Sequence, residues 1–192
     1  MLPVAIARMT YADYLAFEAD SGTKHEFLNG EVFDMAGGTI THGALAMAVG
    51  AALTNALRDR RCRVLSSDVR VRAKTTGLAT YADVTVVCDK IEVDEDDPHG
   101  VLNPSLIVEV LSDSTEAYDR GAKAAHYRRI ASLREYALVG QGEPLVEVYR
   151  RNERGNWELF VEARRGEIVE LTSCGEPVRI EVDAIYRDPL AG

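Results

Sequence analysis

Hydrophobic and polar positions recur along the chain with two different periods. Between residues 41 and 60 the apolar side chains follow helical spacing, which predicts a long helix with one broad apolar face, beginning at Thr41 or His42. The residues on that face are Leu45, Ala48, Val49, Ala52, Leu53, Ala56 and Leu57. Two shorter helices are expected over 11–20, where Thr10 and Asp13 have the spacing of a capping pair, and over about 116–130.

Short segments rich in alternating or β-branched residues predict the strands. Residues 24–36 predict a hairpin, because Asn29-Gly30 between two apolar halves is a strong turn signal. Residues 62–74 predict one or two strands whose basic side chains are exposed, and residues 80–89 and 102–112 predict two more. Five further strands are expected after Leu133.

This order of elements predicts an α/β protein of the α+β kind, with helices packed on a mixed sheet. The 192 residues fit a single domain, with a core over about 10–140 and a β-rich C-terminal extension over about 141–187. The longest apolar segment, 44–53, is about half the length that a bilayer span requires, and the apolar N-terminal segment is shorter than that of a secretory signal. We therefore expect a cytoplasmic protein without a membrane partner.

Charge and cysteine content narrow the possible functions. The net charge of −9 opposes unspecific binding to nucleic acid, although basic residues cluster at 58–63, 70–74 and 128–129. These clusters either form one basic face or are merely solvated helix ends and strand edges. The three cysteines are widely separated and form no C-x-x-C pair, so we expect core residues rather than a disulfide framework or a zinc site.

A carboxylate in an apolar strand is the first candidate for chemistry. Side chains alternate along a strand, so Glu109 should lie on the face of Ile107 and Leu111, among apolar neighbours. Asp83 begins the strand before it, and two neighbouring strands would bring these carboxylates together around a hard cation, Mg²⁺ or Mn²⁺. The alternatives are an exposed edge-strand position for Glu109 and an ordinary turn for Asp83.

Four segments together resemble a known family: HEFLNGEV (25–32), YADVTVVCD (81–89), PSLIVEVLSDST (104–115) and YDRGAKAAHYRRIASLREYALV (118–139). They resemble the Uma2 family, also called DUF820, whose members are described as restriction endonucleases, and the PD-(D/E)xK nuclease superfamily. The resemblance covers about residues 11–139. It implies a restriction-endonuclease-like core, a Mg²⁺ or Mn²⁺ cofactor, and hydrolysis of phosphodiester bonds in DNA.

The resemblance also implies the site residues. An E-x-K motif would place its lysine at position 111, where the chain has leucine, and Lys123 in the following helix matches the family's lysine instead. Asp83, Glu109, Lys123 and Glu26 would be catalytic, and the three carboxylates would bind the metal ion together with the backbone carbonyl of Val110. For Glu26 the alternative is a solvent-facing strand residue. For Lys123 the alternative is a simple ion pair with Asp119, four residues before it.

Three residues are secondary candidates. His42 could approach a phosphate at the start of its helix. Arg120, Lys123 and Tyr127 lie at helical spacing and should form one stripe, in which Tyr127 is expected to be a core residue.

Two other functions are compatible with the sequence. The same fold could form a catalytically inactive module that binds nucleic acid, or the strand-rich C-terminal part could serve an oligomeric, structural role. For a nuclease we expect a homodimer, because two strands of DNA require two sites.

Overall fold

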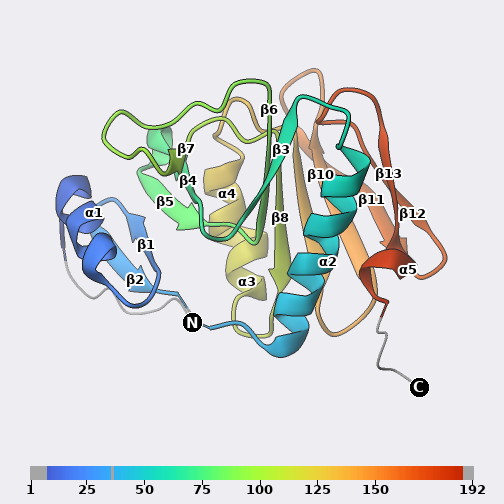
Figure 1. Cartoon of the computed structure of the whole chain (residues 1–192), viewed down its shortest axis with the longest axis horizontal. Coiled ribbons are helices and arrows are strands. Elements are labelled where there is room, and N and C mark those ends of the chain that lie inside the picture. The colour runs from blue at the N-terminus through green and yellow to red at the C-terminus, as the bar shows by residue number, and fades with distance from the viewer. Residues whose placement is uncertain (1–7, 36, 188–192) are drawn as a thin grey trace.

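The centre of the molecule is a six-stranded sheet with the order β11-β10-β9-β8-β6-β3, in which only β8 and β9 are parallel neighbours (Figure 1). The computed structural model describes residues 8–35 and 37–187. The strands are β3 (Cys62–Ser66), β6 (Val84–Cys88), β8 (Leu106–Leu111), β9 (Glu135–Gly140), β10 (Leu145–Arg151) and β11 (Trp157–Arg164). The C-terminal strands β10 and β11 thus extend the same sheet as β8.

Helix α2 (Ile40–Ala56) covers one face of this sheet (Figure 1). It starts earlier than predicted, because the side chain of Thr39 accepts a hydrogen bond from the backbone of His42, and it ends before Arg60. Its buried side chains are Leu45, Val49 and Leu53, as the helical spacing predicted. The hairpin of β12 (Ile168–Leu171) and β13 (Val178–Glu181) and the short helix α5 (Val182–Ile185) complete this layer.

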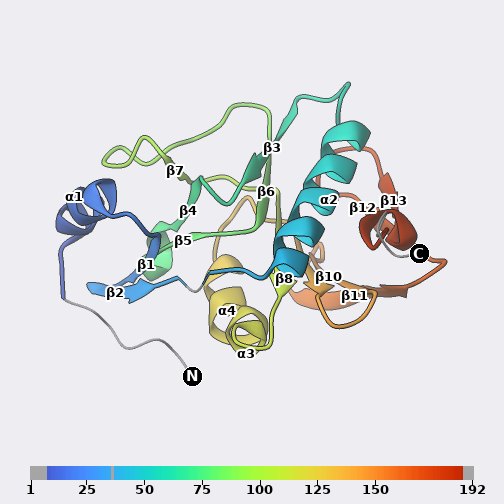
Figure 2. The same cartoon turned by 60° about the horizontal axis from the view of Figure 1, so that its bottom comes forward.

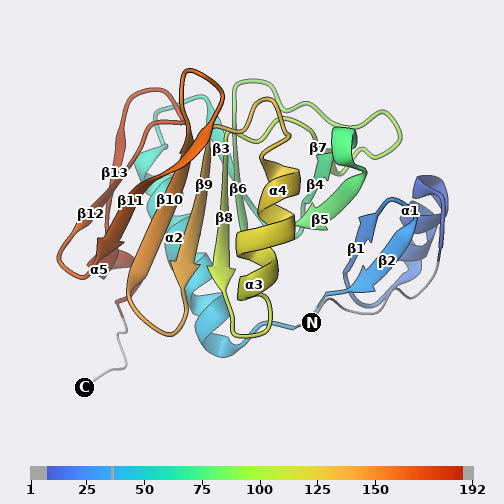
Figure 3. The ribbon, with the colours of Figure 1, turned by 180° about the vertical axis from the view of Figure 1, so that it is seen from behind.

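The opposite face of the sheet is covered by α3 (Glu116–Tyr118), a π-helical turn (Asp119–Lys123) and α4 (Ala124–Tyr127), as Figure 3 shows. One helix over 116–130 was predicted. The observed helical segment, residues 116–127, is shorter than predicted, and its middle turn is π-helical and therefore wider than an α-helical turn. Such turns are frequent at functional sites. The alternation along β8 is as predicted: Ile107 and Leu111 pack in the cluster under α4, and Leu106, Val108 and Val110 pack under α2.

A second sheet of five strands lies beside the first, with the order β2-β1-β5-β4-β7 (Figure 2). Its strands are β1 (His25–Leu28), β2 (Glu31–Asp34), β4 (Arg70–Ala73), β5 (Leu78–Tyr81) and β7 (Gly100–Val101), with a 3₁₀ turn at Lys74–Thr76. Helix α1 (Tyr11–Asp20) packs on this sheet, and its predicted capping pair of Thr10 and Asp13 is confirmed. Asn29 and Gly30 form the predicted hairpin turn, with φ angles of 49° and 95°.

Two of the segments predicted to form strands, 62–74 as one or two strands and 80–89 as one, are each divided between the two sheets. Segment 62–74 contributes β3 to the large sheet and β4 to the small one, and segment 80–89 contributes β5 to the small sheet and β6 to the large one. Asp83 lies in the junction between β5 and β6, where the chain crosses from one sheet to the other. This crossing places Asp83 beside residues of both sheets.

The basic residues of β4 are not exposed, contrary to the prediction. The Arg70 guanidinium lies 2.6 Å from Oδ1 of Asp97, and Arg72 lies 3.6 Å from Asp94. Both aspartates are buried, at 0% and 2% exposure. Part of the acidic segment 92–97 therefore folds inward and neutralises the basic residues of β4, which stabilise the small sheet instead of forming a surface.

The buried ion pair of Asp97 should make the free energy of unfolding depend on pH in acid. Burial alone would raise the pKa of its carboxyl, but hydrogen bonds and charge from Arg70 outweigh burial and hold the pKa below its ordinary value. The stabilisation is therefore fully present above the unfolded-state pKa of about 4 and is lost as the pH falls through the lower, folded-state pKa. We expect urea unfolding of Asp97→Asn to depend less on pH below 5 than that of the wild type. Equal pH profiles would contradict this, and Asp96→Asn, exposed in the same loop, is the control.

Cys62 and Cys88 form a disulfide between β3 and β6, where they are directly paired residues. The expectation of three free core cysteines was wrong for this pair and right for Cys174, which is buried in the core. The pairing could not be predicted, because it follows from the register of two strands separated by 26 residues.

Reduction of this disulfide is expected to lower the free energy of unfolding by about 3 kcal/mol, the chain-entropy value for a loop of this size. Urea unfolding with and without a phosphine reductant measures the change, and the double variant Cys62→Ser/Cys88→Ser should not respond to the reductant. Alkylation of three free thiols in the urea-unfolded, unreduced protein would refute the pairing.

Candidate active site

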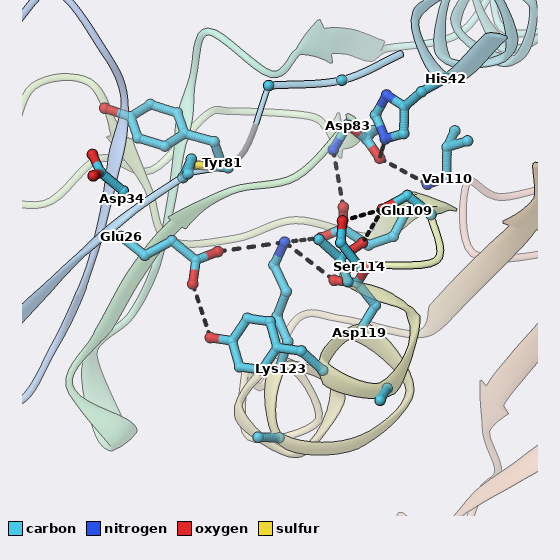
Figure 4. Close-up of a pocket in the computed structure, with 18 residues that line it drawn as sticks. Glu26, Asp34, His42, Tyr81, Asp83, Glu109, Val110, Ser114, Asp119 and Lys123 are labelled. Carbon is cyan, nitrogen blue, oxygen red and sulfur yellow. Dashed lines mark hydrogen bonds and ion pairs between the residues drawn. The ribbon is translucent and has the colours of Figure 1, made fainter. Parts of the chain in front are cut away.

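A pocket of about 460 Å³ opens where the two sheets meet. Figure 4 shows its polar side chains pointing toward one another from five parts of the fold. They are Glu26 of β1, His42 of α2, Asp83 of the β5–β6 junction, Glu109 of β8, and Asp119 and Lys123 of the π-helical turn. Most of the residues predicted from the sequence thus line one cavity.

Two backbone hydrogen bonds connect Asp83 with the segment of Glu109 and Val110. The amide of Val110 donates to Oδ2 of Asp83 at 2.7 Å, and the amide of Asp83 donates to Oε2 of Glu109 at 3.3 Å. Their strands are neighbours as predicted, because β6 pairs with β8. Glu109 is 3% exposed in an interior strand, which excludes the edge-strand alternative.

The ammonium group of Lys123 lies among three carboxylates. Its Nζ is 2.9 Å from Glu109, 3.5 Å from Glu26 and 3.5 Å from Asp119. Burial alone would lower the pKa of Lys123, but the negative charge of Glu109 and its neighbours outweighs burial and holds the pKa well above its ordinary value. Lys123 is therefore charged at neutral pH, and it makes both the predicted contact with the site and the alternative ion pair with Asp119.

Hydroxyl groups hold the glutamates in place. Glu26 is buried and accepts hydrogen bonds from Tyr118, at 2.9 Å, and from Thr80, so it is not a solvent-facing strand residue. Tyr127 donates to Oε1 of Glu109 at 2.9 Å from its position in the core. The roles of Tyr118 and Thr80 were missed in the sequence analysis, since nothing in their spacing indicates contact with Glu26.

His42 contacts Asp83 from the first turn of α2. Its Nε2 lies 3.3 Å from Oδ2 of Asp83, and this hydrogen bond raises the pKa of His42. Burial alone would raise the pKa of Asp83, but the hydrogen bonds from His42 and from the Val110 amide outweigh it and lower that pKa. His42 thus holds one oxygen of Asp83, while the other, Oδ1, accepts no hydrogen bond from residues 8–35 and 37–187.

Arg120 does not belong to the pocket, so the predicted stripe of Arg120, Lys123 and Tyr127 is wrong. Its guanidinium binds Glu116, at 2.7 Å, and Glu147. The π-helical turn changes the angular offset between residues, and it directs Lys123 into the pocket while Arg120 points away from it.

The balance of charge in the pocket fits a hard divalent cation. Five carboxylates line the pocket: four lie around one ammonium and one imidazole, and the fifth is that of Asp34. All five offer oxygen ligands, which Mg²⁺ and Mn²⁺ prefer. Burial raises the pKa of Glu109 to about 8, Lys123 counteracts this increase, and the charges of Asp83 and Asp119 add to it; burial also raises the pKa of Asp119. A divalent ion would offset this excess of negative charge.

Comparisons with known proteins show the family of the chain. A family model named Uma2, with the description "Putative restriction endonuclease", matches residues 11–181. Two proteins of Synechocystis sp., the uncharacterized proteins slr1290 and sll1609, are each 33% identical to the chain over 180 and 160 residues. The alignments cover 94% and 83% of this chain and 92% and 90% of those relatives.

No helix within the described residues is long and apolar enough to cross a membrane.

A solved structure shares the fold. The crystal structure of a putative nuclease belonging to DUF820 from Anabaena variabilis superimposes with a TM-score of 0.71 over 96% of this chain and 98% of that one, at 15% identity. The predicted fold class is therefore confirmed. Because the family model covers most of the chain and both Synechocystis relatives match over most of their length, the chain belongs to the Uma2 family of putative restriction endonucleases.

Proposed function

We propose that the protein is a metal-dependent DNA endonuclease that hydrolyses phosphodiester bonds in the pocket between the two sheets. The observation that carries this proposal is the meeting of Asp83, Glu109 and Lys123 in one cavity. Membership of the Uma2 family supports the choice of nuclease chemistry.

Asp83 and Glu109 would hold Mg²⁺ or Mn²⁺, with Glu26 and the backbone carbonyl of Val110 as further ligands. Oδ1 of Asp83 supports this assignment, because it accepts no hydrogen bond within the described chain. Such an ion polarises a phosphate and lowers the pKa of bound water.

Lys123 would act as a hydrogen-bond donor and a positive charge at the reacting phosphate. Its high pKa favours orientation of the attacking water and stabilisation of the charge that develops on phosphate oxygens over proton abstraction. Tyr118, Tyr127 and His42 would be positioning residues, since each binds a carboxylate of the site through a hydrogen bond.

An inactive module that binds nucleic acid is the second candidate. The observation in its favour is that Lys123 neutralises part of the site through three carboxylate contacts. DNA is the proposed partner in both cases. For the nuclease we also propose a homodimer in the cytoplasm, and sedimentation of the purified protein tests the dimer.

Cleavage of plasmid and of single-stranded DNA in Mg²⁺, Mn²⁺ or EDTA tests the proposed activity. We expect wild-type protein to cleave only with a divalent ion and Asp83→Asn to be inactive. Equal cleavage by both proteins would identify a contaminating nuclease and leave the proposed function without support, as would the absence of cleavage under all conditions.

A further inference from the structure

Four arginines lie at or beside the end of α4, a fifth lies in the turn that follows β10, and none of the five lines the pocket. This arginine cluster consists of Arg128, Arg129, Arg134, Arg151 and Arg154. Within residues 8–35 and 37–187, none of them lies within 4.0 Å of a carboxylate, whereas Arg70, Arg150 and Arg164 all form ion pairs. The cluster therefore concentrates positive charge on a protein whose net charge is −9.

Backbone contacts hold the cluster together. The amide of Arg151 donates to the carbonyl of Arg134 at 2.9 Å, and the guanidinium of Arg151 donates to the carbonyl of Arg128 at 2.6 Å. Arg154 lies in the turn that follows β10, close in sequence to Arg151. Figure 3 shows that the end of α4 and the β10–β11 connection lie toward the same end of the sheet.

Two of the five arginines have structural roles and three do not. Arg151 binds carbonyls at the end of α4 and stacks on Trp157, and Arg128 stacks on Tyr149. The remaining three side chains are exposed and form no side-chain hydrogen bond within the described residues: Arg129, Arg134 and Arg154. Within the described part of the fold no carboxylate lies within 4.0 Å of these three guanidinium groups, so an anionic partner could pair with them directly.

A path of small side chains leads from the pocket to the cluster. Ala117, Gly121, Ala122 and Ala125 are exposed along α3, the π-helical turn and α4, and Ala117 and Ala122 also line the pocket. Side chains of this size let another backbone approach the helix closely. From Lys123 to Arg129 the axial rise is about 9 Å, the length of roughly three base-pair steps.

We propose that the arginine cluster is a second binding site for the DNA phosphate backbone, contacting the strand a few nucleotides from the bond in the pocket. The choice of DNA rests on the proposed function. The site would explain how an acidic protein holds a polyanion, because phosphate contacts supply most of the affinity that does not depend on sequence.

Binding of a fluorescent 20-base-pair duplex in EDTA, followed by anisotropy, tests the inference separately from cleavage. We expect the triple variant Arg129→Ala/Arg134→Ala/Arg154→Ala to weaken binding at least about tenfold at low salt. It should also reduce the slope of log Kd against log salt by about 3, because each arginine removed leaves one phosphate without its cation. The matched control is Arg58→Ala/Arg63→Ala/Arg179→Ala, which removes the same charge from exposed positions elsewhere and should change Kd less than twofold.

Equal weakening of binding in the two triple variants would attribute the effect to net charge and overturn the inference. Undiminished binding by the cluster variant, or no binding by the wild type at low salt, would overturn it as well. Weakening confined to the cluster variant supports the site even if the wild type cleaves no DNA, so the two proposals fail separately. Equal urea midpoints for wild type and variants establish that all are folded.

Discussion

Glu109→Gln is expected to lower the rate of divalent-dependent DNA cleavage by about 10³-fold or more, the scale found when an enzyme loses one group that stabilises the reacting charge. Glutamine has nearly the same shape as glutamate and can still bind Tyr127, but it removes the negative charge that faces Lys123 and the proposed metal ion. Rates of plasmid nicking under single-turnover conditions measure the effect.

Arg120→Ala is the matched control for this experiment. Arg120 lies in the same π-helical turn as Lys123 but binds Glu116 and Glu147 outside the pocket, so its removal should change the rate only a few-fold. A Glu109→Gln protein that cleaves at the wild-type rate would exclude Glu109 from the reaction. A large decrease in Arg120→Ala would indicate that disturbance of the helical layer, rather than removal of the carboxylate, controls the rate.

Lys123→Met is expected to lower the free energy of unfolding by about 3–5 kcal/mol, the range for removing one partner from a buried ion pair. The substitution keeps the length of the side chain but leaves Glu26, Glu109 and Asp119 without the ammonium that contacts all three. Urea unfolding in EDTA measures the decrease. Added Mg²⁺ should recover part of it, because a bound cation would offset the same carboxylates.

Lys24→Met is the control, because it makes the same substitution in an exposed ion pair. Lys24 pairs with Asp68, whose side chain is 80% exposed, and exposed pairs contribute at most about 1 kcal/mol. If Lys123→Met were as stable as the wild type or more stable, the inactive-module alternative, in which the charges of the site are unused, would be favoured. The recovery by Mg²⁺ separates a metal site from a purely structural ion cluster.

The meeting of Asp83 and Glu109 could be predicted because it depends on local patterns. Alternation along residues 106–111 indicated which face Glu109 occupies, and the burial of Ile107 and Leu111 under α4 agrees with it. Asp83 directly precedes the β-branched run of β6, so the pairing of two consecutive buried strands was enough to bring the carboxylates together.

Other parts of the fold depend on contacts between distant segments and could not be predicted. Segments 62–74 and 80–89 have continuous strand-like patterns of hydrophobic and polar residues. Nothing in these patterns marks the residues at which each segment passes from one sheet to the other. The disulfide of Cys62 and Cys88 follows from the register across this division. Helical spacing also predicted that Arg120 lies on the same face as Lys123. This failed because the order of polar and apolar residues does not show that residues 119–123 form a π-helical turn.

The supporting residues of the site also escaped prediction. Tyr118 and Thr80 bind Glu26 from segments 92 and 54 residues away in sequence, so only the folded chain reveals their contact. The sequence predicted that Arg70 and Arg72 are exposed, whereas both form ion pairs, with Asp97 and Asp94. These aspartates lie in a loop, and the alternation of residues along the strands does not predict where that loop folds.

Calorimetric titration with Mn²⁺ in the absence of DNA tests the proposed metal site most directly. Wild-type protein should bind at least one Mn²⁺, and Asp83→Asn and Glu109→Gln should each weaken that binding by a factor of about 10 to 100 or abolish it, since each removes a carboxylate from an oxygen-ligand site. Arg120→Ala should bind Mn²⁺ as the wild type does. Equal affinities in the wild type and in both carboxylate variants would contradict a metal site at Asp83 and Glu109.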